Sequence, residues 1–412
     1  MNAATHLERL LSTFEKWLHL PDLSAVLLTL ATIAANRLPG DPVWLMLIGP
    51  PGSGKTELLV PLTALRYVWM VATLTEAALL SGTSQKEKTS DATGGLLKEL
   101  GRFGIILCKD FTSVLSMHRD ARGAVLAALR EVFDGSWTRR LGVDGGRTLS
   151  WQGKVGLLAG CTDAIDTHHA VIASMGERFV FFRMPPTDAR AQARRALDHT
   201  GNEEEMRAEL AHAVSTFFGT IRLARRFPEL GRTVKDRLID LSELAVRCRS
   251  AVERDPYFRE IVLIPEPEAP TRLAGVLSRL FVGLEAIGVE PPQAWPLVRS
   301  VALDSMPMVR RVVFDVLARE SEWMLETKQV AERSQYPNQT IRRALEELEA
   351  HGIVERERPE KPGRDVWALS TWATRRYEAI MAPFPEMSAD DAEEPAPTGA
   401  KGHSRNVVSL SQ

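Results

Sequence analysis

Short apolar runs recur along the first half of the chain, separated by polar segments and helical patterns. There are five such runs, at residues 44–48, 67–73, 103–108, 154–160 and 179–184. Runs of this length are typical of strands that are buried on both faces. Apolar residues at helical spacing occupy residues 1–37, with a break at Pro21, and residues 119–133. The pattern predicts an α/β fold with five strands.

The pattern changes after the fifth strand and divides the chain into regions. Residues 187–295 have strong helical spacing, many Arg and Glu residues and almost no strand signal. The final segment is polar and rich in Ala, Pro and acidic residues, as disordered tails are. We expect an N-terminal helical segment, a core, a helical lid, a C-terminal domain and a tail, with bounds 1–38, 39–186, 187–300, 301–382 and 383–412.

A glycine-rich segment follows the first predicted strand. Residues 49–56 read GPPGSGKT and match the pattern G-x-x-x-x-G-K-[ST]. Glycines let backbone N–H groups turn inward around a phosphate, and the next helix adds the positive end of its dipole. Lys55 is expected to reach the β- and γ-phosphates of ATP, and Thr56 to bind Mg²⁺. The predicted nucleotide-binding residues are Gly49, Pro50, Pro51, Gly52, Ser53, Gly54, Lys55 and Thr56.

An acidic residue follows the third predicted strand. Asp110 comes two residues after this strand, where a carboxylate can orient Mg²⁺ or its water ligands. Two consecutive acids are usual at this place, but Lys109 occupies the first position. Either Asp110 performs both roles or another carboxylate contributes, for which Glu131 is a candidate. The alternative is that Asp110 is only a surface acid.

Three further residues are placed to act on a phosphate. Thr162 follows the fourth strand and can sense the γ-phosphate. Arg178 precedes the fifth strand, where it either forms a structural ion pair, with Glu177 as a candidate partner, or stabilises phosphate charge on a neighbouring subunit. Arg272 is expected in the first turn of a helix capped by Thr271, within reach of a phosphate.

Two polar segments interrupt the core. Residues 81–95 have the composition of an exposed loop, and a loop this long in a compact domain is usually functional. Residues 136–151 contain Asp144-Gly145-Gly146 between two strand-like segments, which predicts a β-hairpin. The hairpin would carry Arg139, Arg140 and Arg147. It is either a solvated ribbon or a contact to nucleic-acid phosphates in the channel of a ring.

The pattern at 306–380 predicts a winged helix-turn-helix. Helices capped by Thr327 and Asn338, the latter ending at Gly352, precede two strands. Ile341, Leu345 and Leu348 are expected in its core. The candidate DNA contacts are Gln339, Thr340, Arg342 and Arg343 on the third helix, and Lys361 and Arg364 on the wing. The alternative is a protein-binding domain, because Glu346, Glu347 and Glu349 give the same helix an acidic face.

The order of these motifs resembles that of the AAA+ ATPases, in particular the branch with the MCM helicases and the MCM-like replication ATPases of mobile elements. The resemblance covers about residues 40–300. It implies a P-loop core with a five-stranded parallel sheet and a helical lid. Glu177-Arg178-Phe179 stands where the family has its arginine-finger tripeptide, and Thr271-Arg272 matches its sensor-2 position.

The resemblance also implies an activity. We expect hydrolysis of ATP with Mg²⁺, DNA as a partner, a homo-oligomeric ring that is a hexamer, and helicase or DNA-dependent ATPase function. Lys109 leaves the rate of hydrolysis open, and the family's large N-terminal DNA-binding domain is not seen. Two alternatives remain: an ATP-gated DNA-binding regulator without unwinding, and an interaction protein whose winged helix binds a protein.

Composition narrows the class of protein. Among 412 residues, 44% are hydrophobic and 25% are charged, which is typical of a globular protein. The net charge of −2 leaves no global basic field, so any DNA contact must come from a local patch. The three cysteines are too few for a disulfide framework and suit a reducing cytoplasm, so a cytoplasmic location is expected. The apolar stretch 23–35 contains two threonines and is interpreted as a buried helix, so no membrane association is expected.

Overall fold

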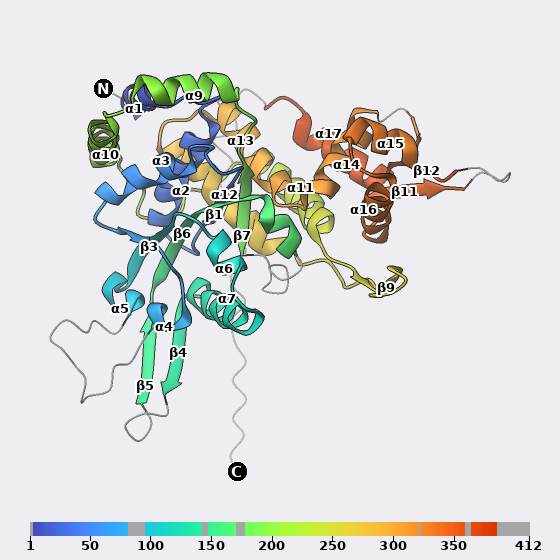
Figure 1. Ribbon diagram of the computed structural model, residues 1–412, viewed down its shortest axis with the longest axis horizontal. Coiled ribbons are helices and arrows are strands. Elements are labelled where there is room, and N and C mark those ends of the chain that lie inside the picture. The colour runs from blue at the N-terminus through green and yellow to red at the C-terminus, as the bar shows by residue number, and fades with distance from the viewer. Residues whose placement is uncertain are drawn as a thin grey trace, which may run out of the picture.

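The computed structural model describes residues 3–80, 95–141, 147–169, 178–320, 323–358 and 364–384. Within them the chain forms an α/β structure around a parallel sheet (Figure 1). Most of the polar segment 81–95, the turn 144–146, Glu177, Lys361 and nearly all of the tail 383–412 lie outside the described residues.

The central sheet has five parallel strands, as predicted. They are β1 (Trp44–Ile48), β2 (Val68–Val71), β3 (Phe103–Cys108), β6 (Lys154–Cys161) and β7 (Phe179–Arg183), in the order β2-β3-β6-β1-β7. Every residue of β1 is buried. Ile48 is paired with Cys161, and Cys108 with Ala159, so that β1, β3 and β6 end close to one another. Because neighbouring strands are parallel, their carboxyl ends share one edge of the sheet.

Helices and a β-ribbon accompany the strands of the core. The segments are α1 (Ala3–Trp17), α2 (Ser24–Arg37), α3 (Lys55–Leu59), η1 (Val60–Ala64), α4 (Glu76–Leu79), α5 (Leu96–Leu100), α6 (Thr112–Leu115), α7 (Arg119–Phe133), η3 (Asp163–His168), and the ribbon β4 (Ser136–Leu141) with β5 (Arg147–Gln152). The prediction of a hairpin at 136–151 is confirmed by the antiparallel pairing of β4 and β5. The ribbon extends from the sheet at the end away from α9 (Ala189–Asp198) (Figure 1).

Helix α2 is enclosed, which accounts for its apolar sequence. Leu28 is 0% exposed, and α12 (Thr271–Ala286) packs along the helix. A Cβ on Gly283 of α12 would lie 2.5 Å from the carbonyl oxygen of Ala31, so glycine is what allows the two helices to approach this closely. The interpretation of 23–35 as a buried helix is confirmed. Within the described residues, every helix is too short or too polar to cross a lipid bilayer.

The region after the sheet is mainly helical, as predicted, but it contains one hairpin that the helical pattern does not predict. Its helices are α9, α10 (Glu203–Thr220), α11 (Arg232–Arg249), α12 and α13 (Pro291–Asp304). The hairpin consists of β8 (Glu253–Arg254) and β9 (Ile261–Leu263), which pair antiparallel. The apolar, β-branched run at 261–264 is the available signal for it.

The C-terminal part contains four helices and a three-stranded antiparallel sheet among its described residues. Its elements are α14 (Met308–Arg319), β10 (Leu325–Glu326), α15 (Thr327–Ser334), α16 (Asn338–Ala350), β11 (Val354–Glu357), β12 (Val366–Leu369) and α17 (Thr371–Met381). The sheet order is β10-β12-β11. Ile341, Leu345 and Leu348 are at most 1% exposed, which confirms them as core residues. Gly352 follows α16 with φ 70°, a left-handed conformation.

Three predicted helix caps are wrong by one residue. Thr271, Thr327 and Asn338 are the first residues of their helices, and the caps are Pro270, Glu326 and Pro337. Before α15 the carboxylate of Glu326 accepts from the backbone three residues later, and its own N–H donates to the Gln329 side chain at 2.8 Å. At α15, therefore, the acid that precedes the threonine caps the helix.

A buried arginine fastens the C-terminal part to the helical region. Arg310 of α14 is 6% exposed, and its Nε donates to Glu347 of α16 at 2.8 Å. Its Nη1 donates to the carbonyl oxygens of Cys248 and Ser250, at 3.2 and 2.5 Å. One guanidinium thus joins α14, α16 and the end of α11.

Arg310→Ala is expected to lower the free energy of unfolding by about 3 kcal/mol, because Glu347 and two carbonyl oxygens lose a buried partner. Thermal or urea unfolding of the purified protein measures the change. Arg319→Ala removes an exposed charge from the same helix and is expected to change stability by less than about 0.5 kcal/mol. Equal effects of the two substitutions would contradict the role given to Arg310.

Candidate phosphate-binding site

The glycine-rich loop leaves the carboxyl end of β1 and enters α3. Gly52 and Gly54 have φ values of 80° and 85°, a region of backbone conformation that favours glycine. The Gly49 N–H donates to the carbonyl oxygen of Cys161 at 3.2 Å, which ties the start of the loop to β6. Two glycines of the sequence motif therefore stand at positions where the backbone adopts a conformation that favours glycine.

Lys55 folds back into the loop. Its Nζ donates to the carbonyl oxygens of Gly49 and Pro50 at 2.6 and 2.8 Å, and to Ser53 Oγ at 3.1 Å. Burial lowers the pKa of Lys55, while the nearby Cys161, Asp163 and Asp110 act to raise it. The loop thus encloses a partly buried cation whose hydrogen-bond partners are acceptors that a phosphate oxygen can replace.

The ends of β3 and β6 are joined by Thr112, a threonine that sequence reasoning does not single out. Asp110 Oδ1 accepts from the backbone N–H of Thr112 at 2.9 Å. Thr112 Oγ1 lies 3.3 Å from Thr162 Oγ1 and accepts from the Thr162 N–H at 3.2 Å. A Cβ on Gly160 would lie 2.6 Å from the Lys109 carbonyl oxygen, so this glycine permits the close approach. Asp110 and Thr162 are thus brought together, as predicted.

A second carboxylate at this edge also escapes the sequence reasoning. Asp163 directly follows Thr162, is exposed, and is close enough to influence the pKa of Lys55. Glu131, the candidate from sequence, lies in the last turn of α7, and the carbonyl oxygen of Gly135 just beyond accepts from Gly153, which directly precedes β6. This places Glu131 at the amino end of the strands, so its candidacy is wrong.

Helices after the sheet contact the loop, which the sequence does not indicate. Gln192 Nε2 of α9 donates to the carbonyl oxygen of Gly52 at 2.9 Å. Arg207 of α10 pairs with Glu57 of α3 at 2.7 Å. These contacts come from 140 and 150 residues further along the chain. The helical region therefore reaches the loop itself.

Arg178 is enclosed within its own subunit. It is 5% exposed, and its Nη2 donates to Asp134 at 2.7 and 3.0 Å. Its guanidinium also lies over the ring of Phe133, 5.5 Å from the centroid. This burial favours the structural ion pair among the two expected roles, with Asp134 as a partner.

Arg272 makes a contact within the helical region. It lies in the first turn of α12, as expected, and its Nη1 donates to Glu268 at 2.6 Å. Glu268 also pairs with Arg249, which is 1% exposed, at 2.9 Å. Arg272 therefore belongs to an ion-pair group with Arg249 and Glu268, the acid that lies just before α12.

Two of the three hairpin arginines differ in their surroundings, while the side chain of Arg147 lies outside the described part of the structure. Arg139 donates to the carbonyl oxygen of Leu80 at 2.8 Å and pairs with Glu76 at 3.1 Å, so it fastens the ribbon to α4. Arg140 is exposed. Of the two, Arg140 has the exposure that a phosphate contact needs.

The residues predicted to contact DNA lie among acids. Gln339 is exposed, while Thr340 and Arg343 are half-buried. Arg342 pairs with Glu346 at 3.1 Å and Asp365 at 3.4 Å. Arg364 pairs with Glu326 at 3.0 Å and remains 71% exposed. The phosphates of DNA would have to compete with these carboxylates for Arg342 and Arg364.

The acidic face of α16 is used inside the chain. Glu346 pairs with Arg254 at 3.2 Å, and Glu347 pairs with Arg254 and Arg310 at 3.1 and 2.8 Å. Glu349 pairs with Arg356 at 3.0 Å. These pairs remove the acidic face as an argument for a protein-binding domain.

No model of a known protein family matches this chain, and no curated protein matches it significantly. Among the described residues, no three His, Cys, Asp or Glu side chains are grouped as metal ligands. A Mg²⁺ ion at Thr56 and Asp110 would therefore take most of its ligands from phosphate oxygens and water, as this ion commonly does.

The ion pair of Arg178 predicts an asymmetry. Asp134→Ala leaves the buried guanidinium of Arg178 without this carboxylate and is expected to lower stability by roughly 2–3 kcal/mol. Arg178→Ala leaves Asp134, whose side chain is 51% exposed, to water and is expected to cost less. Urea unfolding of both single variants and the double variant measures the coupling. Parent-like stability of Arg178→Ala together with lost ATP turnover would instead indicate a catalytic role.

Proposed function

We propose that this protein binds and hydrolyses ATP and acts on DNA as a ring-forming ATPase of the AAA+ type, similar to the MCM branch. One observation carries the proposal: Lys55 lies in a glycine-rich loop at the end of β1, Thr162 follows the adjacent strand β6, and Asp110 follows β3, the next strand beyond β6. A cation, a carboxylate and a hydroxyl thus converge where phosphates would lie.

Each residue has a distinct task in this proposal. Lys55 exchanges its three acceptors in the loop for β- and γ-phosphate oxygens, which carry more negative charge. Thr56 and Asp110 would hold Mg²⁺, whose charge offsets that of the phosphates. Thr162, oriented by Thr112, donates its hydroxyl to the γ-phosphate or to the attacking water.

Asp163 supplies the second carboxylate in our proposal. Lys109 stands where an acid is expected, and Asp163 is the exposed acid beside Thr162 that interacts with Lys55. A carboxylate there can accept a proton from, or orient, the attacking water. Asp163, which follows the neighbouring strand β6, would thereby replace the acid that is absent at position 109.

The finer parts of the fold belong to the same proposal. We assign residues 187–300 as an AAA+ lid because Gln192 and Arg207 join this region to the loop and to α3. We assign α14–α16 and the sheet β10-β12-β11 as a winged helix. Its third helix, α16, carries the exposed Gln339 and Arg342 near its start.

A second function, an ATP-gated DNA-binding regulator with slow hydrolysis, is favoured by one observation. Lys109 is exposed beside Asp110, where its charge competes with Mg²⁺ for the carboxylate. In this case ATP binding, rather than turnover, would control assembly on DNA.

Asp110→Asn is expected to bind ATP with parent-like affinity and to lose roughly 100-fold in turnover, because it removes a charge at the reacting phosphate and keeps the shape. Fluorescent nucleotide titration and phosphate release, each with and without DNA, measure the two effects. Lys55→Ala is the comparison and is expected to weaken ATP binding about tenfold or more.

The same assays separate the two carboxylates. Asp163→Asn is expected to slow turnover without weakening binding. If Lys55→Ala binds ATP as the parent does, the phosphate site is wrong. If the parent binds ATP but hardly hydrolyses it under any condition, the regulator is the better description.

Arg342→Ala is expected to weaken duplex DNA binding for all sequences and to reduce the salt slope by about 1, because one phosphate contact is lost. Fluorescence anisotropy at several salt concentrations measures both. Arg375→Ala removes an exposed arginine from α17 and serves as the control. Equal binding by the parent and Arg342→Ala would contradict DNA recognition by α16.

A further inference from the structure

Exposed apolar side chains are concentrated on the hairpin β8–β9. Tyr257 is 91% exposed and Phe258 is 81% exposed, and the segment formed by β9 and the residue after it adds Val262, Leu263 and Ile264 at 64, 51 and 50%. At about 150–200 Å² for each large side chain, they present roughly 500 Å² of apolar surface. Patches of this size on a monomer are often functional. We call residues 253–264 the aromatic ribbon.

The aromatic ribbon is held in one shape. Asp255 Oδ1 accepts from the N–H groups of Tyr257 and Phe258 at 2.8 and 2.7 Å. Arg259 closes the turn with φ 61°, and its N–H donates to the Asp255 carbonyl oxygen at 3.0 Å. Arg254 fixes the base of the ribbon to two glutamates of α16. A preorganised loop loses little conformational entropy when it binds.

The charges of the aromatic ribbon do not suit nucleic acid. Glu253, Asp255 and Glu260 accompany the aromatic pair, and Arg254 is already paired with two acids. Arg259 adds one exposed cation to the turn, so acids still outnumber bases around the tip, which disfavours phosphates. A partner surface should instead be apolar and bordered by cations.

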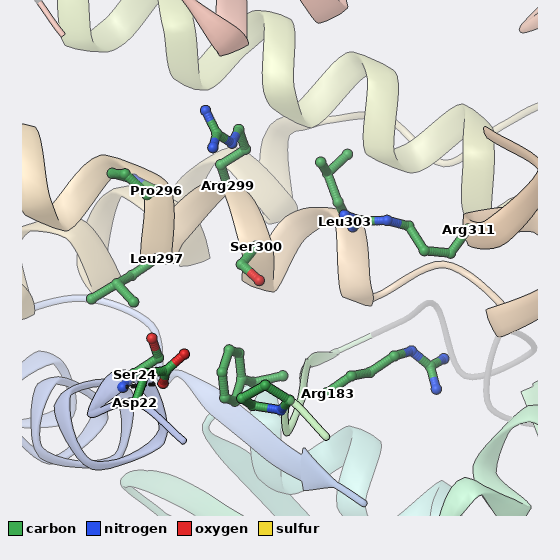
Figure 2. A pocket seen from close by; sticks show the side chains of 11 residues that line it. Asp22, Ser24, Arg183, Pro296, Leu297, Arg299, Ser300, Leu303 and Arg311 are labelled. Carbon is green, nitrogen blue, oxygen red and sulfur yellow. Dashed lines mark hydrogen bonds between the residues drawn. The ribbon is translucent and has the colours of Figure 1, made fainter. Parts of the chain in front are cut away.

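A cavity elsewhere on the same chain has this character. It has a volume of about 320 Å³ and lies between the end of β7, the residues before and at the start of α2, and α13. Figure 2 shows Leu297 and Ser300 of α13 pointing across it toward Asp22, Ser24 and Arg183. The remaining lining residues include Phe182, Pro185 and Leu303, which add apolar surface to the cavity wall. The cavity is large enough to admit an aromatic side chain.

Three arginines and one acid, Asp22, line the cavity. Arg183 pairs with Asp166 at 2.8 Å, and Arg311 pairs with Asp315 at 2.8 Å. Burial and the neighbouring Arg311 lower the pKa of Arg299. Arg299 Nη1 donates to the Ile380 carbonyl oxygen at 3.3 Å, and in the part of the chain that the structure describes no carboxylate pairs with Arg299. This cavity can therefore accept acidic and aromatic groups together.

We propose that the Tyr257–Phe258 tip of the aromatic ribbon docks into this cavity of a second copy of the chain. The tip does not fill a cavity of its own chain, because both of its side chains are almost fully exposed. The contact is heterologous, so each copy has one ribbon and one cavity, and repetition can close a ring. This deepens the ring of the proposed function and rests on it.

Cross-linking tests the contact directly. Phe258→Cys and Ser300→Cys place one thiol on the ribbon and one in the cavity, while the native Cys108, Cys161 and Cys248 are buried. A mixture of the two single variants under mild oxidation should give a covalent dimer. Leu197→Cys, on an exposed site of α9, replaces Phe258→Cys in the control mixture. Equal cross-linking in both mixtures would overturn the proposal.

Assembly gives the second measurement. Tyr257→Ser/Phe258→Ser should weaken self-association about tenfold or more by sedimentation velocity with ATP, whereas Leu197→Ser should not. Unchanged melting temperature and ATP binding would show that the ribbon variant folds. If the ribbon variant assembles as the parent does, this docking is wrong while the ring stands. If the parent itself does not assemble, both the docking and the ring fall, whereas the ATP site is judged by its own binding assay.

Discussion

The parallel register of the central sheet is the constraint on which the candidate site depends. The pairing of Ile48 with Cys161 and of Cys108 with Ala159 makes three strands end near one another. Each strand then continues into polar residues at the same edge, which brings together groups that lie far apart in the chain. Burial of the whole of β1 fixes the point from which the loop of Lys55 departs. A change in this register would separate all the groups at once.

Much of the sheet can be predicted from the sequence because its strands are short apolar runs with clear ends. The loop at 49–56 is recognisable because its conformation depends on glycines at fixed positions. The placement of helices against the sheet is not visible, so Glu131 is a candidate in the sequence although it lies at the opposite end of the strands. Thr112 and Gln192 escape the sequence reasoning because their partners are distant in the chain, and a single threonine or glutamine has no pattern of its own.

Ion pairs explain other differences between sequence and structure. Arg178 and Arg139 occupy notable positions in the sequence, but their partners Asp134 and Glu76 are distant in the chain. The acids of α16 form an evident acidic face in the sequence, and the structure pairs them with four arginines of the same chain. Charge patterns along a chain indicate which residues are available, but only the fold decides which of them remain exposed.

The attachment of the C-terminal part has a mechanical consequence. Arg310 joins α14 and α16 to the end of α11, and Arg376 of α17 pairs with Glu243 nearer the middle of α11. Trp295 of α13 adds a hydrogen bond to the Ile380 carbonyl oxygen at 2.9 Å. Because these contacts lie at separate points, they hold the C-terminal part rigidly against the helical region. A small rotation of α11 and α13 would then become a larger displacement at the far end of α16.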